Sequence, residues 1–179
     1  MTSADSSTSA APSSLAARLC AAADAIEHLP LETPPVLRLA QAWNGFYLAR
    51  AISVLLSAKA TPHRDAYDLA ERWGTQALEL LEPVIGAQLA RKYTPGGDRS
   101  AAGVAELARN GQLELYTAAD ADIEKITGEM IRVAAALQRL LEAVGDDDAA
   151  PPVQQSVARA VAPLAREVWA HYGGDGGGW

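Results

Sequence analysis

The clearest pattern in this chain is a run of seven apolar residues in its last third, spaced alternately three and four positions apart. Such spacing places apolar side chains along one side of a helix that packs lengthwise against another helix. It predicts a helix that starts at Thr117 or Asp120 and runs to Val144. We name these seven residues the seam. They are Ile123, Ile126, Met130, Val133, Leu137, Leu140 and Val144.

Five further helices are predicted from apolar periodicity between proline and glycine boundaries. The helix expected at 35–60 has apolar residues on nearly every side of its axis, so we place it in the middle of a bundle. Gly45 within it costs about 1 kcal/mol relative to alanine and predicts the close approach of a neighbour or a ligand. Pro83 predicts a kink near residues 81–82, and Pro163 predicts another in the last helix. The expected ranges are 15–29, 35–60, 62–93, 99–110 and 152–172.

These elements predict an all-α fold, a bundle of five or six helices with disordered N- and C-terminal tails. A length of 179 residues fits one domain, which we place at 14–172. Residues 1–13 are predicted to be a disordered tail and residues 173–179 a flexible one. An acidic linker is expected at 145–152, before the last helix.

Composition agrees with this fold and narrows the partners. Hydrophobic residues make up 49% of the chain and aromatic residues 6%, so we expect an aliphatic, alanine-rich core. The net charge of -7 disfavours nucleic acid and anionic membrane surfaces. No run of 18 apolar residues occurs, so no membrane span is expected. The single cysteine, Cys20, fits a reducing compartment, and we predict a cytoplasmic protein.

The seam has two interpretations that the sequence leaves open. It can pack inside the bundle, or it can form an interface with a partner or a second copy. We therefore predict a non-catalytic helical interaction protein, such as an accessory subunit, an adaptor or an assembly factor. Its partner is expected to be another protein or a second copy, with homo-oligomers favoured. The expected packing or interface residues are Ile123, Ile126, Met130, Val133 and Leu137.

The three histidines lack the spacing of known helical metal sites. None forms His-x3-His, and none forms the Glu-x-x-His of di-iron bundles. We expect no metal and no cofactor.

Arg166 and His171 lie near the end of the last helix with four residues between them, as Arg-x4-His. This spacing resembles the motif of HEPN ribonucleases. In that family the Arg and His of two protomers meet at a dimer interface, where they would position the scissile phosphate and help transfer the 2′-hydroxyl proton. The resemblance implies an alternative function, a HEPN-like ribonuclease with Arg166 and His171 as its catalytic residues. The other interpretation is a solvated helix face.

A second alternative is a small-molecule-binding module with an aromatic pocket between helices. The helix at 35–60 carries polar residues among aromatic ones, and buried amides need hydrogen-bond partners. A satisfied core network would also explain this pattern. The expected pocket residues are Trp43, Asn44, Tyr47 and Trp73.

Overall fold

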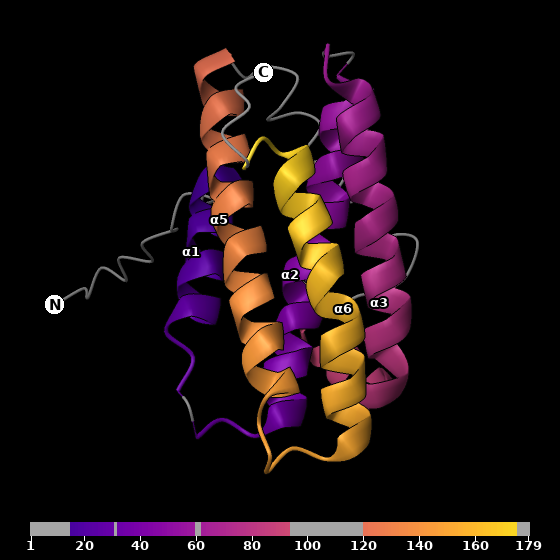
Figure 1. Ribbon diagram of the computed structural model, residues 1–179. Helices are drawn as coiled ribbons and strands as arrows, with labels where there is room; N and C mark the ends of the chain where they lie inside the picture. The colour runs from indigo at the N-terminus through magenta and orange to yellow at the C-terminus, as the bar shows by residue number, and fades with distance from the viewer. Residues whose placement is uncertain (1–14, 31, 60–61, 94–119, 175–179) are drawn as a thin grey trace, which may run out of the picture.

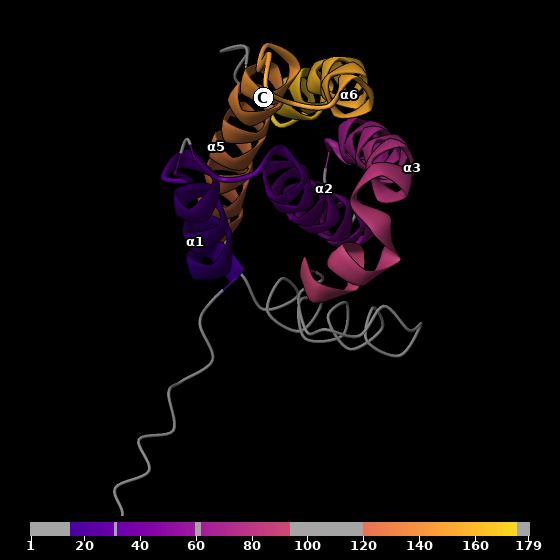
Figure 2. The same cartoon turned by 90° about the horizontal axis from the view of Figure 1, so that it is seen from below.

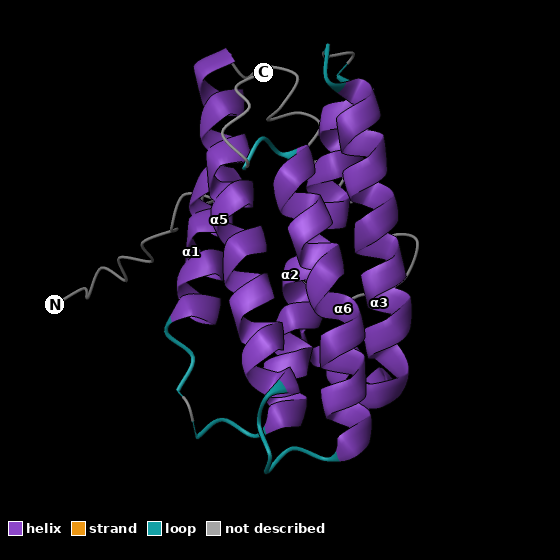
Figure 3. Ribbon diagram, viewed as in Figure 1, coloured by secondary structure: helices purple, strands orange, loops and turns teal. Residues whose placement is uncertain are grey.

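Five helices that run alongside one another form a bundle in the computed structural model (Figure 1). The structure describes residues 15–30, 32–59, 62–93 and 120–174, and no strand occurs among them (Figure 3). The prediction of an all-α bundle is confirmed. The helices are α1 (Leu15–Glu27), α2 (Pro35–Ala58), α3 (Arg64–Tyr93), α5 (Asp120–Gly145) and α6 (Pro152–His171).

Helix α2 lies at the centre of the bundle, as its apolar surface predicts. It contacts each of the other four described helices, and α3 most extensively. In the view along the bundle, α1 and α3 lie on opposite sides of α2 (Figure 2). Helix α6 closes the arrangement because it packs against both α5 and α3.

The α5 seam is part of the internal core. Met130, Val133, Leu137 and Val144 are fully buried, and Ile126 is only 3% exposed. Ile123 is half-buried and packs against the same core. The seam is therefore covered by the chain's own helices, so a partner of this folded chain would have to bind another surface.

Gly45 allows α2 and α5 to approach closely, as its place in the sequence predicts. A Cβ atom at this position would lie 2.7 Å from Cδ2 of Leu137. Leu137 therefore packs directly against the α2 backbone. Glycine has a lower helix propensity than alanine, but a larger residue at this position would push the two helices apart.

Helix α3 bends at a different place from the one predicted. The sequence places the kink at residues 81–82, because Pro83 lacks the backbone N–H that an internal helical residue donates. The structure instead shows non-helical angles at Gly86, with φ 79° and ψ 149°. Only glycine adopts this conformation without strain, so the distortion is confined to Gly86. Pro163 lies inside α6, which continues through it as one helix.

The predicted linker at 145–152 is a hydrogen-bonded turn. Asp146 N donates to the Glu142 carbonyl at 3.0 Å, and Ala150 N donates to the Asp147 carbonyl at 2.9 Å. The predicted tail at 1–13, the predicted helix at 99–110 and residues 175–179 lie outside the described residues.

Helix α6 ends in a glycine cap formed by Gly173 and Gly174, the first two residues of the predicted tail. Gly173 has a φ of 86°, and Gly174 N donates to the Trp169 carbonyl at 3.0 Å. This is the hydrogen bond of a Schellman motif. Gly174 lies so close to the Trp169 indole that a Cβ atom there would be 2.2 Å from Cε2. The cap therefore holds the Trp169 ring in place.

A buried hydroxyl pair joins α2 to the end of α6. Ser53 Oγ donates to the Ala49 carbonyl at 2.8 Å, and the Tyr172 hydroxyl lies 2.8 Å from Ser53 Oγ. Because the one proton of Ser53 is used, Tyr172 is the donor in this pair. Burial raises the pKa of Tyr172, which remains a neutral phenol. The ring of Tyr67 from α3 lies 5.5 Å from that of Tyr172, so three helices meet at this point.

Gly45→Ala tests the contact between α2 and α5. We expect a loss of about 1–3 kcal/mol in unfolding free energy, because the added methyl group overpacks the core at Leu137. In a Leu137→Ala background, which alone costs about 2–5 kcal/mol, the same change should be neutral or stabilising. Urea denaturation of the four proteins measures this coupling.

Gly128→Ala is the matched control, because a Cβ atom at Gly128 would meet nothing within 4 Å. We expect it to stabilise α5 by up to about 1 kcal/mol. Equal effects of Gly45→Ala in both backgrounds would contradict the close approach of the two helices.

Candidate interaction surface

The predicted aromatic residues lie on α2 and α3, but they do not line the cavities described below. Trp43 is 2% exposed and belongs to the core. Its ring stacks on that of Tyr47, with centroids 5.6 Å apart and planes 18° apart. Asn44 and Trp73 are half-buried. The Trp43–Tyr47 stack is a packing element, while a ligand pocket around these residues remains a prediction.

Arg166 and His171 are both on α6 but point in different directions. Five positions along an α-helix correspond to a rotation of about 140°. Arg166 is exposed and faces α5, whereas His171 Nε2 lies 4.0 Å from Glu167 Oε2. One chain does not bring the two side chains together, so the ribonuclease interpretation depends on a second protomer.

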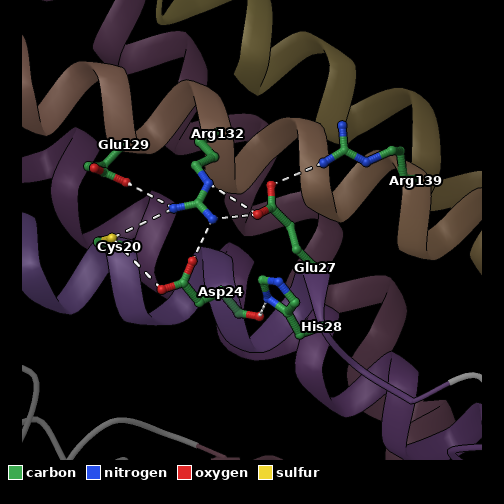
Figure 4. A network of polar contacts seen from close by, with 7 residues as sticks. All are labelled: Cys20, Asp24, Glu27, His28, Glu129, Arg132 and Arg139. Carbon is green, nitrogen blue, oxygen red and sulfur yellow. Dashed lines mark hydrogen bonds and ion pairs between the residues drawn. The ribbon is translucent and has the colours of Figure 1, made fainter.

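A network of charged side chains joins α1 to α5 (Figure 4). Arg132 of α5 donates to Asp24 Oδ1 and to Glu27 Oε2, both at 2.5 Å. Arg139, two turns further along α5, donates to Glu27 Oε1 at 3.2 Å. The hydrogen bond from Arg132 lowers the pKa of Glu27, against the opposing effect of burial. The network keeps α1 aligned on α5.

Cys20 lies at the edge of this network, with Sγ 3.6 Å from Arg132 Nη1. Among the described residues, no three His, Cys, Asp or Glu side chains are grouped so that they could hold a metal ion.

A second ion pair ties the start of α2 to the turn between α5 and α6. Arg38 is 8% exposed and donates through Nη2 to Asp147 Oδ2. Ala149 N also donates to the Asp147 carboxylate, at 3.0 Å. The Arg38 hydrogen bond, more than that of Ala149, lowers the pKa of Asp147. Gln155 Nε2 fixes the other side of the turn by donating to the Asp147 carbonyl at 2.9 Å.

A groove runs between α5 and α6, and we name it the α5–α6 groove. It consists of two hollows that share Gln138 and Arg166. One, of about 310 Å³, is lined by Ala135, Gln138, Arg139, Arg166 and Trp169. The other, of about 270 Å³, is lined by Gln138, Glu142, Asp146, Arg159, Ala162, Pro163 and Arg166.

The two ends of this groove differ in charge. No carboxylate lines the hollow next to Trp169, whereas Glu142 and Asp146 line the other. Arg159 and Arg166 form no ion pair or hydrogen bond with any described residue. Each guanidinium group can therefore accept a new partner without breaking an existing bond.

The sequence contained only part of the signal for this groove. Arg159, Arg166 and Trp169 recur at three- and seven-residue intervals on α6, which places them along one face of that helix. The pattern does not show which helix lies opposite that face.

Comparison with known proteins gives no assignment. No protein-family model, no curated protein and no solved structure matches this chain. Among the described helices, none has both the length and the apolar character needed to cross a bilayer.

Asp147→Asn tests the ion pair at the turn. Because the folded-state pKa of Asp147 is lowered, the pair stabilises the fold above the ordinary carboxyl pKa of about 3.9. This contribution is lost as the pH falls through the lower folded-state pKa. We expect Asp147→Asn to lower the melting temperature at pH 7, and the difference from wild type to shrink towards pH 3.

The neighbouring Asp148→Asn is the control, since Asp148 is exposed and has no ion-pair partner among the described residues. Melting followed by circular dichroism between pH 7 and pH 3 makes the comparison. A deficit of Asp147→Asn that stays constant over this range would contradict the role of the carboxylate charge.

Proposed function

We propose that this chain is a non-catalytic interaction protein that binds another protein through the α5–α6 groove. The observation that supports the proposal is a pair of exposed arginines, Arg159 and Arg166, that have no partner among the described residues. Arg166 lines the same hollow as Trp169. Arginine and tryptophan are enriched at protein interfaces and dominate their binding energy. An accessory subunit, an adaptor or an assembly factor would use such a surface.

Charge complementarity favours a partner segment that carries carboxylates and an apolar residue. A carboxylate would meet Arg166 and Arg139 in the hollow that has no acidic lining residue. An apolar side chain would lie against the Trp169 ring. Glu142 and Asp146 at the other end oppose a continuous polyanion such as nucleic acid. The net charge of -7 also opposes a second copy of this chain at long range.

Arg166→Glu tests this surface. We expect it to weaken partner binding about 10- to 100-fold, because it places a carboxylate against the acidic segment. Affinity capture from the source cell, quantified by mass spectrometry, identifies proteins retained by wild type and lost by the variant. Calorimetry with the purified partner then measures the loss directly.

Arg72→Glu on α3 is the matched control, because Arg72 is also exposed and forms no ion pair with a described residue. It makes the same charge change on a different helix and should leave binding unchanged. A partner retained equally by Arg166→Glu and wild type would contradict the proposal. So would capture of nothing but further copies of this chain.

A further inference from the structure

A separate cavity lies on the α1 side of α5. It is open to solvent, has a volume of about 220 Å³ and is lined by the end of α1, the segment that follows it, the start of α2 and one side of α5. We name it the α1–α5 pocket. Its apolar lining residues are Ile26, Leu29, Pro30, Ala136, Leu140 and Ala143.

The size and walls of this pocket suit a compact apolar group. Six of its nine lining residues have apolar side chains, and Ile26, Ala136 and Leu140 belong to the buried core. An apolar cavity of about 150 Å³ is enough to hold a benzene ring. A volume of about 220 Å³ therefore admits a single ring, or a short aliphatic chain, with a small substituent.

The polar lining residues are Glu27, Arg38 and Arg139, so the pocket has more cationic than anionic groups. The Glu27 carboxylate already accepts hydrogen bonds from Arg139 and from Arg132. The charge of Glu27 is therefore balanced by these arginines, and the charge of Arg38 is balanced by Asp147.

The two pocket arginines have donor capacity that the protein leaves unused. The Arg38 side chain is 9% exposed, and its Nε atom is buried without a hydrogen-bond acceptor among the described residues. Arg139 makes its hydrogen bond to Glu27 through Nη2. Each of the two side chains also keeps N–H groups that no described residue accepts from, and a carboxylate would accept hydrogen bonds from those that face the pocket.

We propose that the α1–α5 pocket binds a small free carboxylic acid with a compact aromatic or short aliphatic body. The carboxylate lies at the guanidinium groups of Arg38 and Arg139, and the apolar body lies against Leu29, Ala136 and Leu140. The proposal does not depend on the α5–α6 groove, with which the pocket shares only Arg139.

Phenylacetate is the probe, and phenylacetamide, which has the same shape without the charge, is its control. Calorimetry on the full chain should show saturable binding of phenylacetate, about tenfold or more tighter than phenylacetamide. Arg139→Gln should reduce phenylacetate binding to the level of the amide, and Arg139→Lys should restore part of the difference. Arg72→Gln on α3 should change nothing.

Ala143→Trp separates this pocket from the groove. Ala143 is an exposed lining residue, so a larger side chain can fill the pocket without entering the core. We expect the variant to keep its melting temperature and its protein partner but to lose phenylacetate binding. Arg166→Glu should show the opposite pattern.

Three results would overturn the proposal. Equal affinity for phenylacetate and phenylacetamide would show that the pocket binds the apolar ring and does not recognise the carboxylate. Undiminished binding to Ala143→Trp would place the acid elsewhere on the chain. No saturable binding at millimolar concentrations would show that the pocket does not bind this class of ligand.

Discussion

The burial of the α5 seam against the central helix α2 is the constraint on which the rest of the structure depends. Leu137 reaches the α2 backbone because Gly45 has no side chain, with only 2.7 Å available where a Cβ atom would lie. Protein interiors are packed as densely as organic crystals, so this contact sets the separation of the two helices. Helices α1 and α6 both pack on α5, and their positions follow from it.

Ion pairs around this core fix the orientation of the outer elements. Arg132 holds α1 through Asp24 and Glu27, while Arg38 holds the turn between α5 and α6 through Asp147. The pairs of Arg132 are partly exposed and contribute little free energy, about 0–1 kcal/mol each. The main effect of these ion pairs is on geometry, because they determine which arginines already have a carboxylate partner within the protein. The exposed arginines of α6, Arg159 and Arg166, have no partner among the described residues.

The two proposed binding regions lie on either side of α5 and meet at Arg139. Arg139 lines the α1–α5 pocket and also the hollow beside Trp169. Its side chain is 63% exposed and donates to Glu27 of α1. The two proposed binding regions therefore have this one arginine in common.

The sequence by itself determined the helices, the central place of α2 and the need for a glycine at position 45, because apolar periodicity and helix breakers act over a few residues. Tertiary structure decided that the seam is internal, that the Pro83 region bends at Gly86 and that Trp43 is a core residue. It also paired Arg38 with Asp147, which are 109 positions apart, and placed Arg166 opposite α5 rather than beside His171. Periodicity shows which face of a helix is buried or exposed, but not which helix it will face. Pockets and ion pairs between helices depend on which helices are neighbours, and this arrangement is fixed only when the whole core packs.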